Sequence, residues 1–186
     1  MVEGAKIVFL DRDGVINEYP GDRNYVNNWS EFKFIPGSIE GIRKLNRNGF
    51  KTFIISNQAG VAKELFSRQD LERINKNMLK QLKKKGAYLS GVYYCTHRSD
   101  ENCSCRKPKT RLLEKAVSGL GEKIGATFFI GDSFYDMKAA SNFGAKSILV
   151  LSGKEKISNR SNWEFEPNYI FDNLLVAADF LCSRYE

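Results

Sequence analysis

The chain has 186 residues, of which 42% are hydrophobic and 27% charged, the balance of a soluble globular protein. No apolar run approaches the roughly 20 residues of a membrane span, and the N-terminus carries no secretory signal, so we expect one cytoplasmic domain (1–186), monomeric and without a membrane partner. The net charge of +7 suits an anionic ligand, but charge alone does not indicate nucleic acid, and we expect none as a partner.

Strand and helix patterns alternate along the chain. In chain order they predict strands at 7–10, 51–56, 91–95, 127–130 and 146–151 with an edge strand at 168–171, and helices at 37–48, 67–85, 109–119, 134–142 and 174–183. This order predicts an α/β fold, a three-layer, Rossmann-like and mostly parallel sheet. The gaps are too short for a cap domain, but the irregular segment 17–30 is long enough for a functional flap.

Two aspartates follow the first predicted strand. Asp11 and Asp13 are separated by one residue, so in extended backbone their side chains point to the same side. Two carboxylates at such a short distance repel each other, which is unfavourable unless they bind a cation or act on an anionic substrate. The alternative is a turn in which both aspartates only cap and solvate the chain.

Further polar residues follow the later strands. They are Ser56, Asn57, Gln58 and Ala59 after the second strand, Arg106 and Lys107 after the third, and Asp132 and Asp136 after the fourth. Each group alone is a weak signal, because Ser-Asn is common in turns and Gly-Asp commonly caps a helix. At the carboxyl ends of parallel strands, however, these groups converge on Asp11.

This ordered set, D-x-D-G, then Ser, Lys and G-D-x3-D, resembles the motifs of the haloacid dehalogenase superfamily of phosphatases over nearly the whole chain. The resemblance implies that Asp11 attacks phosphorus to form a phospho-aspartate. It implies that Asp13 protonates the leaving alkoxide and then activates water. Ser56 and Lys107 are implied to bind the phosphoryl group.

The same resemblance implies a catalytic Mg²⁺ ion. Its ligands are implied to be Asp11, Asp132 and the backbone carbonyl of Asp13, oxygen donors of the kind that Mg²⁺ prefers. Asp136, one helical turn further on, is implied to orient a metal-bound water or Lys107.

The sole histidine and three of the four cysteines cluster at 95–105. The set consists of Cys95, His97, Cys103 and Cys105, the ligand types of a closed tetrahedral structural zinc site. The alternative is a group of buried or redox-active cysteines, but a disulfide is disfavoured in the cytoplasm. We therefore predict a zinc-binding loop that ends directly at the two cations Arg106 and Lys107, and a packed or free thiol at Cys182.

The spacing C-x-H-x5-C-x-C-R-K-P resembles one branch of the superfamily. That branch contains the D-glycero-D-manno-heptose 1,7-bisphosphate 7-phosphatases, which supply activated heptose for lipopolysaccharide or related glycans, and the histidinol-phosphate phosphatases. Segments 11–17, 24–26, 56–61 and 92–95 favour the heptose side. The substrate contacts that this implies are Asp11, Arg12, Asp13, Ser56, Asn57, Gln58, Ala59, Arg106 and Lys107.

Two departures from the family pattern bear on substrate recognition. The flap carries extra residues at 21–23, and Ser133 stands where some members have lysine. The short x5 spacing also occurs among histidinol-phosphate phosphatases, so that activity stays an alternative to a sugar phosphate substrate. A third candidate activity is that of a nucleic-acid 3′-end phosphatase. It is disfavoured because the chain lacks an array of aromatic and basic residues for stacking bases.

Overall fold

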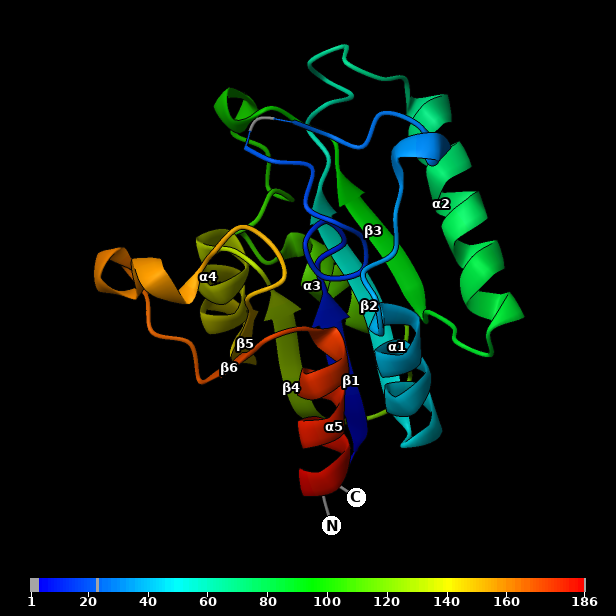
Figure 1. Ribbon diagram of the computed structural model, residues 1–186. Helices are drawn as coiled ribbons and strands as arrows, with labels where there is room; N and C mark the ends of the chain where they lie inside the picture. The colour runs from blue at the N-terminus through cyan, green and yellow to red at the C-terminus, as the bar shows by residue number, and fades with distance from the viewer. Residues whose placement is uncertain (1–3, 23, 186) are drawn as a thin grey trace.

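A computed structural model describes residues 4–22 and 24–185 (Figure 1). Within these ranges six strands form one sheet in the order β3-β2-β1-β4-β5-β6, and all neighbouring strands are parallel. The strands are β1 Ala5–Leu10, β2 Phe50–Asn57, β3 Gly91–Cys95, β4 Ile124–Gly131, β5 Lys146–Val150 and β6 Tyr169–Phe171. The α-helices are α1 Ser38–Arg47, α2 Arg68–Lys84, α3 Arg111–Val117, α4 Phe134–Phe143 and α5 Leu174–Arg184. The predicted parallel α/β sheet is confirmed.

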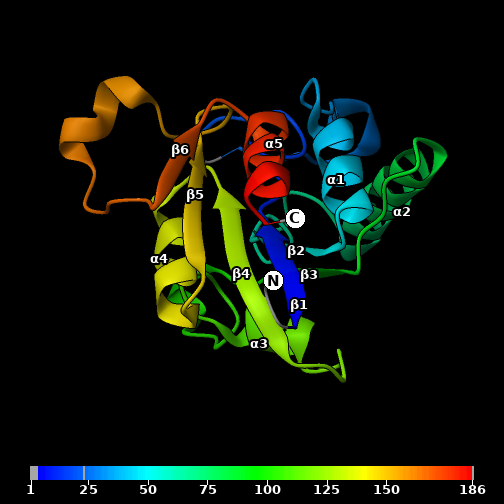
Figure 2. The same cartoon turned by 90° about the horizontal axis from the view of Figure 1, so that it is seen from below.

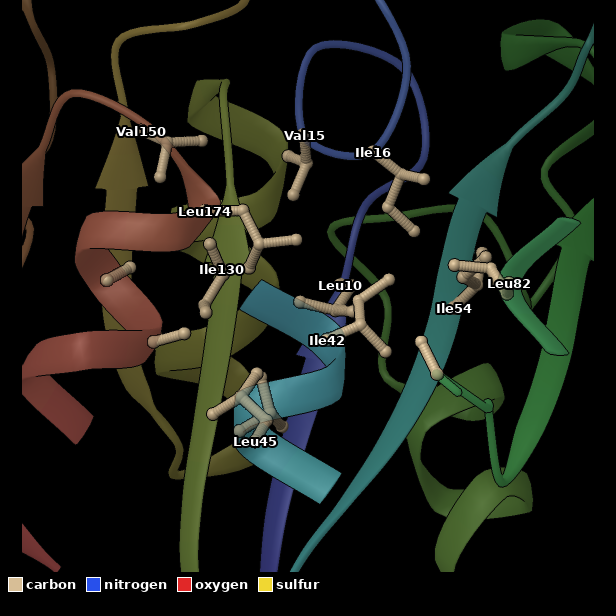
Figure 3. Close-up of a cluster of buried hydrophobic side chains, with 14 of the residues drawn as sticks. Leu10, Val15, Ile16, Ile42, Leu45, Ile54, Leu82, Ile130, Val150 and Leu174 are labelled. Atoms are coloured by element: carbon tan, nitrogen blue, oxygen red, sulfur yellow. The ribbon is translucent and has the colours of Figure 1, made fainter. Parts of the chain in front are cut away.

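The two faces of the sheet follow from the alternation of side chains along β1. Val8 and Leu10 belong to one buried cluster, and Ile7 and Phe9 to the other. Helices α1, α2 and α5 cover the first face, whereas α3 and α4 cover the second (Figure 2). Figure 3 shows the first cluster, where side chains of these three helices meet those of the central strands. Because both faces are covered, the central strands read as continuous apolar runs.

Several element boundaries depart from the sequence prediction. β4 begins at Ile124 rather than at 127, because Ile124 pairs with Ala5, a residue far away in the sequence. The helix predicted at 109–119 begins only at Arg111, since the Lys109 amide donates to the Arg106 carbonyl in a preceding turn (2.9 Å). The other predicted strands and helices lie where the sequence placed them, within a few residues.

Helix α2 begins and ends as its sequence indicates. The Ser67 hydroxyl accepts from the Asp70 amide (3.1 Å), and the Asp70 carboxylate accepts from the Ser67 amide (3.1 Å), which completes a capping box. At the other end Gly86 has a φ of +73°, the left-handed conformation that stops a helix.

The segments that follow the strands lie above their arrowheads in Figure 1, at one edge of the sheet. In its described residues, 17–22 and 24–30, the predicted flap is irregular apart from the start of a 3-10 helix, η1, at Trp29–Glu31. Two further 3-10 helices, η2 Ser99–Glu101 and η3 Ile157–Asn162, lie in later loops. Of the extra flap residues, 23 lies outside the described ranges. Among the described helices, none combines the length and the apolar character needed to cross a membrane.

The core of the first face should carry much of the stability. Leu45 on α1 is fully buried, whereas Leu65 is 53% exposed. Leu45→Ala should lower the free energy of unfolding by about 2–5 kcal/mol, because it removes buried methyl groups and leaves a cavity. Leu65→Ala, the matched control, should change it by less than about 0.5 kcal/mol. Urea unfolding followed by circular dichroism measures both, and equal effects would contradict the core described here.

Candidate active site

A cleft of about 210 Å³ opens at the carboxyl edge of the sheet. The predicted residues that line it are Asp11, Asp13, Ser56, Asn57, Arg106, Lys107 and Asp132. They come from the ends of β1, β2, β3 and β4, so the parallel sheet brings together segments that are distant in sequence. Arg12, Gln58 and Ala59, predicted as substrate contacts, are instead buried outside the cleft lining, with 0–2% exposure.

Lys107 lies at the centre of the site, with its side chain 2% exposed. Its ammonium lies 3.0 Å from Asp11 Oδ1 and 2.6 Å from Asp136 Oδ1, and it donates to the Ile55 carbonyl (2.9 Å). Burial would lower the pKa of Lys107, but the two carboxylates outweigh burial and raise it. Lys107 is therefore a fixed positive charge.

The backbone of Lys107 is also held in place. Its amide donates to Asn57 Oδ1 (3.0 Å), and its carbonyl accepts from Asn57 Nδ2 (3.2 Å). Asn57 thus pairs both backbone groups of Lys107, which connects the end of β2 to the loop after β3. This position explains why an amide side chain follows Ser56.

Three carboxylates face one another beside Lys107. Asp11, Asp132 and Asp136 each offer an oxygen within 4.8 Å of the others. Burial, opposed by Lys107, raises the pKa of Asp11 to about 6. The pKa of Asp132 lies well above its usual value because of burial, Asp136 and Asp11. One lysine cannot balance three carboxylates, so the group suits a hard cation such as Mg²⁺.

Asp132 sits in a cradle of two glycines. A Cβ added to Gly14 or to Gly153 would come within 2.1 or 2.0 Å of Asp132 Oδ2, so only glycine fits at either position. Gly14 also has a φ of +81°, which disfavours side chains. The Lys154 amide donates to the same Asp132 oxygen (2.7 Å).

The Asp136 carboxylate helps to cap the start of α4. Its Oδ2 accepts from the amide (3.1 Å) and hydroxyl (2.6 Å) of Ser133, the N-cap residue. Its other oxygen contacts Lys107. Asp136 thus contacts Lys107 directly, and Ser133 is used as a helix cap.

Asn24 and Tyr25, from segment 24–26 that favoured the heptose side, also line the cleft. Three further residues of the cleft wall were not predicted from the sequence: Tyr19 from the flap, Tyr135 from α4, and Lys154. The Lys154 ammonium pairs with Asp22 (3.1 Å), which also accepts from the Tyr19 hydroxyl (2.6 Å). Lys154 follows the predicted strand 146–151, so the rule that picked the other strand ends could have found it. Tyr19 carries no comparable signal.

The four predicted zinc ligands also converge. The contacts from Cys95 Sγ to His97 Nδ1 and to Cys103 Sγ are both 3.6 Å, and those from Cys105 Sγ to Cys95 Sγ and to His97 Nδ1 are both 3.2 Å. Ligands at about 2.0–2.3 Å from a tetrahedral zinc ion lie about 3.3–3.8 Å apart. The cluster therefore has the chemistry and spacing to hold zinc, while Cys182 lies elsewhere, packed against the core.

The zinc loop borders the cleft through Arg106. Its guanidinium donates to the His97 carbonyl (3.2 Å) and its side chain lines the cleft. Lys109 donates to the Cys103 carbonyl (2.6 Å). Ordering of the loop and placement of Arg106 and Lys107 are thus structurally linked.

Comparisons with known proteins agree with this fold. A family model described as HAD-hydrolase-like matches residues 104–177. The D-glycero-beta-D-manno-heptose-1,7-bisphosphate 7-phosphatase of Neisseria meningitidis serogroup A is 31% identical over 96% of both chains, and that of Yersinia pestis is 35% identical over 100% of both. The structure of D,D-heptose 1,7-bisphosphate phosphatase from B. bronchiseptica, complexed with magnesium and phosphate, superposes with a TM-score of 0.87 at 27% identity, over 96% of this chain and 98% of that one.

The fold is that of haloacid dehalogenase-like phosphatases, which hydrolyse phosphoric monoesters. Within that class, the chain belongs to the family of the heptose-1,7-bisphosphate 7-phosphatases.

The glycine cradle predicts a selective loss of activity. Gly153→Ala should force Asp132 to move, and a shift of about 1 Å in an active site can cost about 10²-fold in rate. Gly119→Ala is the matched control, because a Cβ there meets nothing within 4 Å. Initial rates of phosphate monoester hydrolysis compare the two variants. Full activity of Gly153→Ala would show that the position of Asp132 is not critical.

Proposed function

We propose that this chain removes the 7-phosphate of D-glycero-β-D-manno-heptose 1,7-bisphosphate. The observation that carries the proposal is Asp11, which lines the cleft and is paired with a buried lysine beside two further carboxylates. The relatives at 31% and 35% identity are named for this substrate and anomer, and they match along nearly their whole length.

Asp11 is the proposed nucleophile. Lys107 and the Arg12 amide (2.7 Å) both contact its Oδ1, which orients the carboxylate. In the first step a carboxylate oxygen of Asp11 bonds to phosphorus and the bond to the sugar oxygen breaks, while Asp13 supplies the proton to that oxygen. In the second step Asp13 takes a proton from water, which attacks phosphorus and releases Asp11 and inorganic phosphate.

Other residues of the cleft are proposed to bind the phosphoryl group, the Mg²⁺ ion and the second anionic end of the substrate. Ser56 and Lys107 bind the transferred phosphoryl group, and Asp11, Asp132 and the Asp13 carbonyl hold Mg²⁺. When bound, Mg²⁺ supplies positive charge that offsets the phosphoryl oxygens. Arg106, whose planar guanidinium presents several donors, is proposed to bind the second anionic end of the substrate.

The Cys95–His97–Cys103–Cys105 cluster is proposed to hold a structural zinc ion. Its support is the four convergent ligand atoms and the contacts of Arg106 and Lys109 with the loop. Neighbouring thiols stay reduced in the cytoplasm, whereas an oxidising compartment favours disulfides, so we propose a cytoplasmic enzyme. A single domain (1–186) and a monomeric state complete the proposal.

A panel of substrates tests the proposed function. We expect kcat/KM to be highest for the β anomer of heptose 1,7-bisphosphate, followed by the α anomer. Fructose bisphosphate, histidinol phosphate and a 3′-phosphorylated oligonucleotide should react far more slowly, because the relatives that match along nearly the whole chain are named for the heptose bisphosphate. Phosphate release gives the rates. A preference for histidinol phosphate or for the oligonucleotide would replace the proposed substrate.

Asp11→Asn should abolish turnover, because an amide does not attack phosphorus. Folding should be preserved, since the two side chains have the same shape. Phosphate release and thermal melting measure the two effects. Asp179→Asn is the matched control, because Asp179 pairs with Lys44 on the surface, and it should keep full activity. Turnover by Asp11→Asn near the wild-type rate would exclude a phospho-aspartate.

The purified protein should contain about one zinc per chain. Cys103→Ser should lose zinc, melt at a lower temperature and lose activity through disorder of Arg106 and Lys107, because metal binding and loop folding share one free energy. Cys182→Ser, outside the cluster, should keep its zinc. Metal analysis beside thermal melting decides the matter. A wild-type protein that is free of zinc yet has an ordered loop would overturn the structural role.

A further inference from the structure

Arg12 carries a charge that is fully enclosed by protein. It is the largest fully buried side chain of the described residues, with 0% exposure. Its guanidinium carbon lies 6.0 Å from the ring of Phe32 and 5.8 Å from that of Tyr94, within the range of cation–π attraction. Burying a guanidinium is unfavourable unless it is paired, so its partner shows what it is for.

That partner is Asp13. Arg12 donates from Nε (3.2 Å) and Nη2 (2.9 Å) to Asp13 Oδ1, and from Nη2 to Oδ2 (3.1 Å). The Asp13 side chain is 17% exposed and lines the cleft. A buried cation thus holds a carboxylate that faces the substrate. Lysine has no planar fork with which to make the same three contacts.

Gln58, directly after β2, contacts both Asp13 and Arg12. Its Nε2 donates to Asp13 Oδ2 (2.8 Å) and its Oε1 accepts from Arg12 Nη2 (3.2 Å). The same Nε2 lies 3.2 Å from Ser56 Oγ. Asn17 Nδ2 adds a further donor to Asp13 Oδ1 (2.8 Å). The Asp13 carboxylate is therefore held by three side chains, two of which also contact each other.

We propose that Arg12 and Gln58 are positioning residues for the Asp13 carboxylate, and that neither side chain contacts substrate. The proposal rests on the proposed role of Asp13 as acid and base. Arg12 and Gln58 hold the carboxylate so that it faces the cleft. Gln58 also connects it to Ser56, which is proposed to bind the phosphoryl group. Proton transfer depends steeply on such geometry, since about 1 Å of misplacement can cost about 10²-fold.

A double-mutant cycle between Arg12 and Asp13 tests this. Arg12→Met removes the three donations but keeps an unbranched side chain near Phe32 and Tyr94. We expect it to lower kcat by about 30- to 100-fold with KM changed less than about threefold. Asp13→Asn alone should lower kcat by about 10²–10⁴-fold. In that background Arg12→Met should cost less than about threefold more, because its target has already been removed.

Further variants guard against a simple loss of stability. Gln58→Met removes an uncharged partner of similar size and should repeat the pattern with a smaller loss, about tenfold. Arg12→Lys should fall between Arg12→Met and wild type. Thr52→Val removes a buried hydroxyl that bonds the Tyr88 carbonyl (3.0 Å) away from the site, so it should lower the urea midpoint without lowering kcat. If Arg12→Met fails to fold, the same cycle is measured with Gln58→Met, in the wild-type protein and in Asp13→Asn.

The outcomes separate this inference from the proposed function. Wild-type protein and Asp13→Asn test the substrate and the role of Asp13, and the cycle is run on whichever member of the panel is hydrolysed fastest. Equal losses from Arg12→Met, or from Gln58→Met, in both backgrounds would mean a purely structural role and would overturn the inference. A rise in KM with unchanged kcat would also overturn it, because that would show direct substrate binding.

Discussion

The ion pair of Lys107 with Asp11 and Asp136 is the interaction on which the rest of the site depends. Its ammonium is buried and reaches residues at the ends of β1, β2 and the start of α4, so it connects segments that share no local sequence. Removing Lys107 would leave facing carboxylates without their internal counter-charge, which is strongly unfavourable at a buried site. The proposed nucleophile and the core of the site are therefore stabilised by the same charge.

Two features at the ends of β2 and β3 place that lysine. Asn57 pairs with both backbone groups of Lys107, and the zinc-ligand cluster begins with Cys95 at the end of β3 and ends with Cys105, two residues before Lys107. A loop rich in polar residues has little apolar surface to bury, so a metal ion is an effective way to give it one conformation. Arg106, bonded to the His97 carbonyl, gains its position from the same loop.

The acidic residues have different surroundings, which matches their different proposed tasks. Asp132 lies between two glycines and beside other carboxylates, an environment that favours a cation. Asp13 instead accepts from Arg12, Gln58 and Asn17, so its charge is balanced without a metal contact to its side chain. Asp136 is divided between Lys107 and the cap of α4. One parallel edge thus holds carboxylates with separate partners.

The sequence by itself determined the elements, the mostly parallel direction of the strands and the charged residues at the centre of the cleft, because apolar runs mark buried strands and the polar residues at their ends share one edge. It also determined the likeness of the 95–105 ligands to a zinc site, since ligand type and spacing are local. Only the tertiary structure decided that Arg12 and Gln58 lie behind Asp13, that Tyr19 reaches the cleft, and that β4 extends to Ile124. Those features depend on contacts between distant segments, and no local pattern records which of two polar side chains faces the ligand and which is buried beneath it.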